Sequence, residues 1–91
     1  MYIKKAASAG TLESCDIHIS IEPCEEREIF LTSSVEKQYG NKIRKIIDEV
    51  LDELKIYKVR INAVDRGALD CTIKARLKTA IERSSEEKLE Y

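Results

Sequence analysis

Residues 17–23 read I-H-I-S-I-E-P, and this stretch decides the fold. Ile17, Ile19 and Ile21 alternate with polar residues, which is the two-residue period of a β-strand that buries one face. Pro23 has no backbone N–H to donate to a sheet and ends the strand. Another part of the chain must therefore cover the apolar face, and we expect the opposite face to meet water.

Two further stretches predict strands. Residues 28–32 alternate again after a polar turn, and their closeness along the chain predicts an antiparallel hairpin with the first strand. A third strand is predicted over residues 57–63, where the side chains on one face are Tyr57, Val59, Ile61 and Ala63. Residues 6–11 are small and carry no apolar face, so we expect a mobile approach segment there.

The residues after the second strand predict a long amphipathic helix. Ser33 and Glu36 match the capping box, in which each side chain satisfies a free backbone N–H at the start of a helix. Apolar residues then recur at three- and four-residue steps: Val35, Tyr39, Ile43, Ile46, Ile47, Val50, Leu51 and Leu54. Gly40 costs roughly 1 kcal/mol relative to Ala inside a helix. It therefore permits a close approach or a bend, or it separates two shorter helices.

A second helix is predicted over residues 66–84. Asp65 is suited to the N-cap position, and apolar residues follow at four-residue steps: Leu69, Ile73, Leu77 and Ile81. Residues 68–73 are also compatible with a strand. Residues 85–91 are charged and unpatterned, so we expect a single domain over residues 1–84 followed by a flexible C-terminal tail.

The predicted order of elements is β-β-α-β-α, which defines an α+β fold. Two amphipathic helices would cover one face of a small mixed or antiparallel sheet, giving a two-layer sandwich with the other sheet face open. The half-polar strands agree with this arrangement, because a parallel sheet covered on both faces shows continuous apolar runs.

Composition excludes several classes of function. A formal net charge of -1 provides no field that would hold nucleic acid or an anionic membrane. No apolar run is long enough to span a bilayer, and the N-terminus lacks the apolar core of a secretory signal, so we expect a cytoplasmic protein. Cys15, Cys24 and Cys71 lack close C-x-x-C spacing, and we interpret them as reduced thiols rather than metal ligands.

The residues also argue against catalysis. His18 is the one histidine, and it lies on the polar side of the first strand, where a solvated surface role is the simpler interpretation. The three glycines, Gly10, Gly40 and Gly67, are isolated and form no phosphate-binding loop. We therefore expect no catalytic residue and no metal site, and these patterns alone lead to a non-enzymatic α+β domain.

Three motifs resemble one known family. Residues 9–16 read A-G-T-L-E-S-C-D, residues 33–40 read S-S-V-E-K-Q-Y-G, and residues 65–71 read D-R-G-A-L-D-C. In this order they resemble the acyl carrier (gamma) subunit of citrate lyase, over nearly the whole predicted domain. Three ordered motifs are far more specific than one.

The resemblance implies a modification site at Ser14. In the family, the matching serine carries 2'-(5''-phosphoribosyl)-3'-dephospho-coenzyme A through a phosphodiester, attached by a holo-carrier synthase. The thiol of this arm holds acetyl and citryl thioesters for the alpha (acyl transferase) and beta (lyase) subunits, which cleave citrate to oxaloacetate and acetate. Cys15 departs from the pattern, since the family has glycine there. Glu13 and Asp16 are candidate partner-facing charges because they lie near Ser14.

Two alternatives remain open at this point. The related carrier subunit of malonate decarboxylase uses the same type of arm for a different acyl group. A non-enzymatic protein-interaction module would carry no covalent group at all and would dock a partner on its sheet face or long helix.

Overall fold

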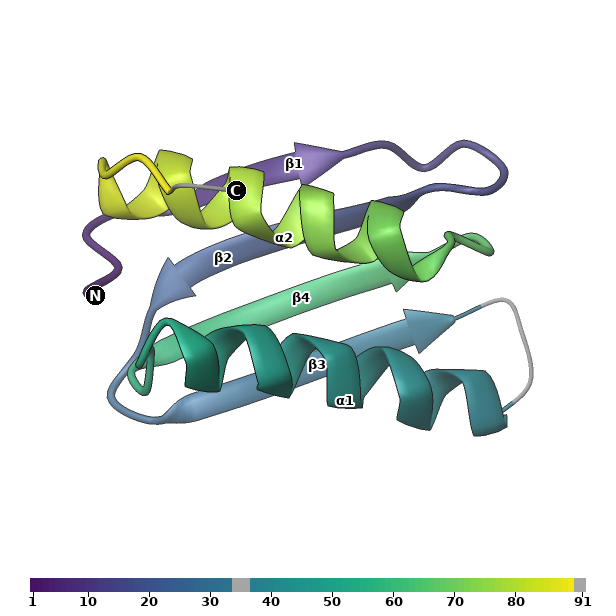
Figure 1. The fold of residues 1–91 in the computed structure, drawn as a ribbon, viewed down its shortest axis with the longest axis horizontal. Helices are drawn as coiled ribbons and strands as arrows, with labels where there is room; N and C mark the ends of the chain where they lie inside the picture. The colour runs from purple at the N-terminus through teal and green to yellow at the C-terminus, as the bar shows by residue number, and fades with distance from the viewer. Residues whose placement is uncertain (34–36, 90–91) are drawn as a thin grey trace.

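The protein is a two-layer α+β sandwich in the computed structural model, which describes residues 1–33 and 37–89 (Figure 1). In chain order the elements are β1 (Ala7–Gly10), β2 (Ile17–Pro23), β3 (Arg27–Ser33), α1 (Lys37–Glu53), β4 (Val59–Asp65) and α2 (Asp70–Ser85). Both helices lie on one face of the sheet, with α2 over β1 and β2 and α1 over β3. The predicted fold class is confirmed.

The sheet is mixed, with the strand order β1-β2-β4-β3. β2 pairs antiparallel with both β1 and β4, whereas β3 pairs parallel with β4. The predicted hairpin between residues 17–23 and 28–32 is therefore wrong. α1 carries the chain back to the end of the sheet where β3 began, so β4 runs parallel to β3 and takes the place between it and β2.

Residues 7–10 form an edge strand, which corrects the expectation of a mobile segment over residues 6–11. Ala7 lies opposite Ile21 and Gly10 opposite His18 in the ladder with β2. Ala9 is 5% exposed and belongs to the core, and α2 packs over this strand. Main-chain pairing and burial beneath a helix hold the strand, so it needs no apolar face of its own.

α1 supplies much of the apolar core. It is continuous from Lys37 to Glu53, so Gly40 does not divide it, and a Cβ at Gly40 would meet only the Leu31 side chain at an ordinary 3.8 Å. Its buried residues include Ile43, Ile46, Ile47, Val50 and Leu51. The predicted capping box includes residues 34–36, which lie outside the described residues.

β4 begins later than predicted. Val59, Ile61 and Ala63 face the core as expected, but Tyr57 precedes the strand and is 60% exposed. The guanidinium of Arg27 lies 5.5 Å from the centre of the Tyr57 ring, which places this ring at the surface beside an arginine. Tyr57 therefore does not belong to the apolar face of the strand.

The second helix also starts later than predicted. α2 begins at Asp70 with Leu69 as its N-cap residue, and Leu69 is 70% exposed rather than part of the apolar face. Asp65 does not cap α2. Its carboxylate accepts hydrogen bonds from the backbone amides of Gly67 (3.2 Å) and Ala68 (3.0 Å), which stabilise a short loop. Gly67 has a φ of 92°, a left-handed conformation that interrupts any helix started at Asp65.

The end of α2 packs closely on the rest of the chain. Ser84 and Ser85 are buried, and the backbone amide of Leu89 donates to the Glu82 carboxylate (2.8 Å). Leu89 also packs against the core. Flexibility of the residues after 84 stays a prediction. In the described part of the chain, neither helix combines the length and the apolar composition needed to cross a membrane.

Candidate functional site

Ser14 lies in the loop that joins β1 to β2, at the end of the sheet where α2 begins (Figure 1). The Asp16 amide donates to the Glu13 carbonyl (3.3 Å), closing a β-turn over residues 13–16 with Ser14 and Cys15 as its central residues. Cys15 has a φ of 63° and Ser14 is not among the residues with positive φ, which is the pattern of a type II turn. Ser14 therefore sits at the exposed corner of an ordered turn.

The turn is joined to the loop between β4 and α2. The Cys15 amide donates to the Arg66 carbonyl (2.8 Å), and the Arg66 amide donates to the Asp16 carbonyl (2.9 Å). Two successive residues, Cys15 and Asp16, thus face one residue, Arg66, directly after the end of β4. This is the arrangement of a β-bulge whose first residue is left-handed, a position that favours glycine. It explains physically why a glycine is expected where this chain has Cys15.

Asp16 is the main anchor of the loop. Its carboxylate accepts two hydrogen bonds from the Arg76 guanidinium of α2, both 3.0 Å long. It also accepts bonds from the Thr11 hydroxyl and the Ile17 amide, each 2.7 Å long. The Arg76 bonds, and then those from Thr11 and Ile17, hold the pKa of Asp16 well below its usual range. Asp16 is therefore a carboxylate at every physiological pH.

Gly10 determines where the loop leaves β1. It has a φ of 91°, and a Cβ added there would lie 1.8 Å from the Ile17 carbonyl oxygen. No side chain fits in this space, so β1 and β2 approach each other closely just before the loop. Thr11 then accepts a bond from the Glu13 amide (3.2 Å) while it donates to Asp16, which continues the ordered path toward Ser14.

The Ser14 hydroxyl is exposed and makes few polar contacts. Its one polar neighbour among the residues that the structure describes is the Cys15 sulfur, at an Oγ–Sγ distance of 3.8 Å. Within residues 1–33 and 37–89, no carboxylate, imidazole or amine is hydrogen-bonded to Ser14, and no cluster of His, Cys, Asp or Glu is suited to a metal ion. The hydroxyl is accessible and has room for a large substituent, but this chain does not activate it as a nucleophile.

The structure separates the two charges predicted to face a partner. Glu13 is exposed, whereas Asp16 is only 9% exposed and points its carboxylate at Arg76. The Asp16–Arg76 pair was missed from the sequence. The two residues are 60 positions apart, and nothing in the local pattern of either one indicates the other.

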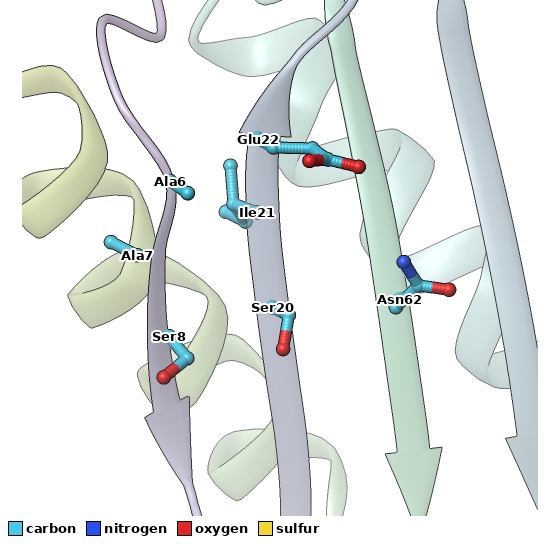
Figure 2. Close-up of a pocket in the computed structure, with 7 residues that line it drawn as sticks. All are labelled: Ala6, Ala7, Ser8, Ser20, Ile21, Glu22 and Asn62. Carbon is cyan, nitrogen blue, oxygen red and sulfur yellow. The ribbon is translucent and has the colours of Figure 1, made fainter.

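A second feature lies on β1 and β2, away from the Ser14 loop. A hollow of about 370 Å³ runs along these strands, and Figure 2 shows Ser8, Ser20, Glu22 and Asn62 among the residues that line it. Its carboxylate, Glu22, is bonded to Arg60 (3.0 Å). The lining therefore offers no free acid–base pair, and the exposed serine of the loop remains the better candidate site.

Comparison with protein families gives the class of protein. A family model described as an acyl carrier protein, the malonate decarboxylase delta subunit (MdcD), matches residues 4–84. A small α+β domain that offers one exposed serine on a braced turn fits this class, a carrier subunit.

Curated relatives make the assignment more specific. A citrate lyase acyl carrier protein of Streptococcus pyogenes is 49% identical over 87 residues, which cover 93% of this chain and 85% of the relative. A protein of the same name from Streptococcus mutans is 50% identical over 88 residues, covering 94% of this chain and 86% of the relative. The chain belongs to the citrate lyase acyl carrier protein family.

A solved structure shares the fold. In the crystal structure of a Pseudomonas malonate decarboxylase hetero-tetramer in complex with malonate, one chain matches with a TM-score of 0.73. The match covers 88% of this chain and 84% of that chain at 20% identity, so it shows a common fold alone.

Proposed function

We propose that this protein is the acyl carrier subunit of citrate lyase and that Ser14 is the attachment site of its prosthetic arm. The arm would be 2'-(5''-phosphoribosyl)-3'-dephospho-coenzyme A, linked to the Ser14 oxygen by a phosphodiester. The observation that carries this proposal is the Ser14 hydroxyl itself. It is exposed at the corner of a turn, in the motif that resembles the family's modification segment, and within the described part of the chain its one polar partner is the Cys15 thiol.

The residues around Ser14 fit such a group. A substituent at the corner of the turn extends into solvent, because the inner side of the loop is held by backbone bonds to Arg66 and by the bonds of the Asp16 carboxylate to Arg76. When bound, the arm supplies a terminal thiol that carries acyl groups. The chain itself contributes the tether, which converts encounters between subunits into intramolecular steps at a raised effective concentration.

The proposed partners are the alpha and beta subunits of citrate lyase and the holo-carrier synthase that attaches the arm. The names of the relatives at 49–50% identity support citrate lyase. In this proposal the protein is a non-catalytic subunit in the cytoplasm. The absence of a base beside Ser14 in the described residues supports a group that is modified by another enzyme rather than one that attacks a substrate.

A malonate decarboxylase carrier is the second candidate. The matching family model carries that name, and the malonate decarboxylase structure shares the fold. Purified alpha and beta subunits of each complex separate the two candidates. We expect the modified carrier to support cleavage of citrate with citrate lyase subunits and to be inert with malonate decarboxylase subunits. The reverse result would assign the chain to malonate decarboxylase.

Ser14→Ala tests the attachment site. The protein is incubated with holo-carrier synthase and the arm precursor, and intact mass is measured. We expect wild type to gain the mass of one arm and Ser14→Ala to gain none while it keeps the wild-type circular dichroism spectrum, because the change removes one exposed hydroxyl. Ser8→Ala is the matched control, since Ser8 is an exposed serine on the adjacent strand, and it should be modified normally.

Two results would contradict this assignment. Arm incorporation into Ser14→Ala would move the site to another residue, with Ser8 the first to examine. A wild-type protein that keeps its bare mass after incubation with the synthase of either complex would instead favour the interaction module without a covalent group.

A further inference from the structure

We propose that Asp16 and Arg76 are positioning residues for arm attachment, and that together they fix the turn that presents the Ser14 hydroxyl to the modifying enzyme. This inference rests on the proposed function of Ser14. It assigns a role to a residue of α2 that lies 62 positions after Ser14 and outside every motif that resembles the family.

The first support is the number and kind of bonds at Asp16. Its two carboxylate oxygens accept four hydrogen bonds, two from Arg76, one from Thr11 and one from the Ile17 amide. Bonds to an ionised carboxylate are short and strong, and the guanidinium fork restricts orientation as well as distance. The side chain of Asp16 is 12% exposed and that of Arg76 is 41% exposed, so water reaches the guanidinium more readily than the carboxylate that it binds.

The second support is the way these bonds connect three parts of the chain. Arg76 belongs to α2, and the next residue of this helix, Leu77, is fully buried in the core. The Arg76 side chain therefore extends from a rigid backbone. Thr11 lies at the beginning of the loop and Asp16 at its end. The carboxylate therefore ties both ends of the loop to each other and to the helix. Ser14 is held between them, two residues from Asp16.

The chemistry of attachment explains why a rigid loop would favour the reaction. Attachment forms a bond between the Ser14 oxygen and phosphorus and breaks the serine O–H bond, with the proton passing to a base of the synthase. A phosphoric anhydride bond of the arm precursor breaks at the same phosphorus, and its phosphate leaving group departs. Such displacement needs the attacking oxygen in line with the leaving group, and a hydroxyl held in place meets that requirement more often than one on a mobile loop.

The bonds of Asp16 do not touch the Ser14 hydroxyl, so their loss should act through geometry. We expect a lower kcat for attachment, because fewer encounters present the oxygen correctly. The KM for the carrier should change less, since the surface that the synthase contacts keeps its composition. If a variant were partly unfolded, the concentration of carrier available to the synthase would fall instead, and kcat would not decrease selectively relative to KM.

The experiment compares four variants as substrates of the holo-carrier synthase with its arm precursor. Asp16→Asn and Arg76→Gln each remove one charge of the ion pair, and Arg76→Lys keeps the positive charge but lacks the planar guanidinium that donates two bonds. Arg83→Gln is the matched control, because Arg83 is also on α2 but donates to the Ser8 carbonyl of β1, away from the loop. Circular dichroism and thermal melting confirm that each variant is folded at the assay temperature.

We expect kcat for attachment to fall about tenfold or more in Asp16→Asn and Arg76→Gln. Arg76→Lys should fall between these variants and wild type, and Arg83→Gln should stay within about twofold of wild type. Amide hydrogen exchange of Cys15 and Ile17 should accelerate in the first two variants and not in the control, since their amides belong to the braced loop.

Three results would overturn the proposal. Attachment in folded Asp16→Asn and Arg76→Gln at the wild-type kcat would show that the pair does not position Ser14. An equal decrease of kcat for attachment in Arg83→Gln would show that any change on α2 has this effect. If wild-type protein acquires no arm at Ser14, both the proposed function and this inference are overturned. If wild type is modified normally, the proposed function stands, and the results for the variants test this inference separately.

Discussion

Cys15 adopts a backbone conformation that its side chain disfavours. Its φ of 63° lies in the left-handed region, as required at the third residue of the type II turn over residues 13–16. A residue with a Cβ pays roughly 1–2 kcal/mol in this region, whereas glycine does not. The turn that carries Ser14 therefore stores backbone strain at Cys15, one residue from the proposed attachment site.

Cys15→Gly should relieve this strain. We expect the free energy of unfolding to rise by about 0.5–1 kcal/mol, because the left-handed cost is removed while the glycine loses more chain entropy on folding. Urea denaturation measures the change. Arm attachment and acyl loading should stay intact, since no base accompanies the Cys15 thiol in the described part of the structure.

Cys15→Ala is the control for this prediction. It removes the thiol but keeps the Cβ, so it should not gain the stability of the glycine variant. A glycine variant that is no more stable than the alanine variant would contradict the strain argument. A large drop in acyl loading of the fully modified Cys15→Gly protein would make the thiol a participant in the chemistry.

At the scale of elements, the end of α1 shows how a helix ends without glycine. The Ile56 amide donates to the Leu51 carbonyl (2.8 Å) and the Lys55 amide donates to the Asp52 carbonyl (3.1 Å). Lys55 has a φ of 56°. These bonds form a Schellman motif, in which Lys55 takes the left-handed position that glycine usually occupies. Ile56 is buried and directs the chain toward β4.

Lys55→Gly should therefore stabilise the end of α1. We expect a gain of about 0.5–1 kcal/mol in the free energy of unfolding, measured by urea denaturation, because glycine accepts the left-handed conformation without steric cost. Lys58→Gly is the control, since Lys58 is also exposed but has no positive φ. Glycine at position 58 adds only chain entropy to the unfolded state, so equal effects of both changes would contradict this account of the motif.

At the scale of the whole molecule, both helices share one apolar layer with one face of the sheet. The fully buried side chains come from both layers, including Ile19 of β2, Ile47 of α1 and Leu77 of α2. In the described part of the chain, no helix covers the other sheet face (Figure 1). Phe30 of β3, 53% exposed, lies on this face because its neighbours Ile29 and Leu31 pack against the core. A domain of this size relies on the single shared layer for most of its stability.

Ile47→Asp should unfold much of the domain. Ile47 is 0% exposed, and an aspartate there would place a charge without a partner in the apolar layer. We expect a loss of at least about 4 kcal/mol, a large part of the stability of a small domain. Circular dichroism and thermal melting measure it. Lys45→Asp is the control, because it puts the same residue on the exposed face of α1. A melting temperature of Ile47→Asp close to that of the control would show that the helix register is wrong.

Much of the fold could be predicted from local patterns, and the site only in part. The buried faces of β2 and α1 follow from the spacing of Ile17, Ile19 and Ile21 and of Ile43, Ile46 and Ile47. Ser14 was singled out by its motif, and the structure shows it exposed. The type II turn could have been inferred from the expected glycine at position 15. The bracing by Arg76 could not, because it depends on how α2 lies over β1 and β2.

By itself, the sequence determined which side chains of β2 and α1 face the core, because hydrophobic periodicity is a local property of each strand and helix, but it wrongly assigned Tyr57 and Leu69 to buried faces. Only the tertiary structure decided that Ala7–Gly10 is a strand, that β4 lies between β2 and β3, and that Asp16 meets Arg76. The physical reason is that strands pair through main-chain groups, which every residue except proline carries alike. Pairing partners, and contacts across 60 residues, therefore depend on the path of the whole chain and leave no local pattern to read.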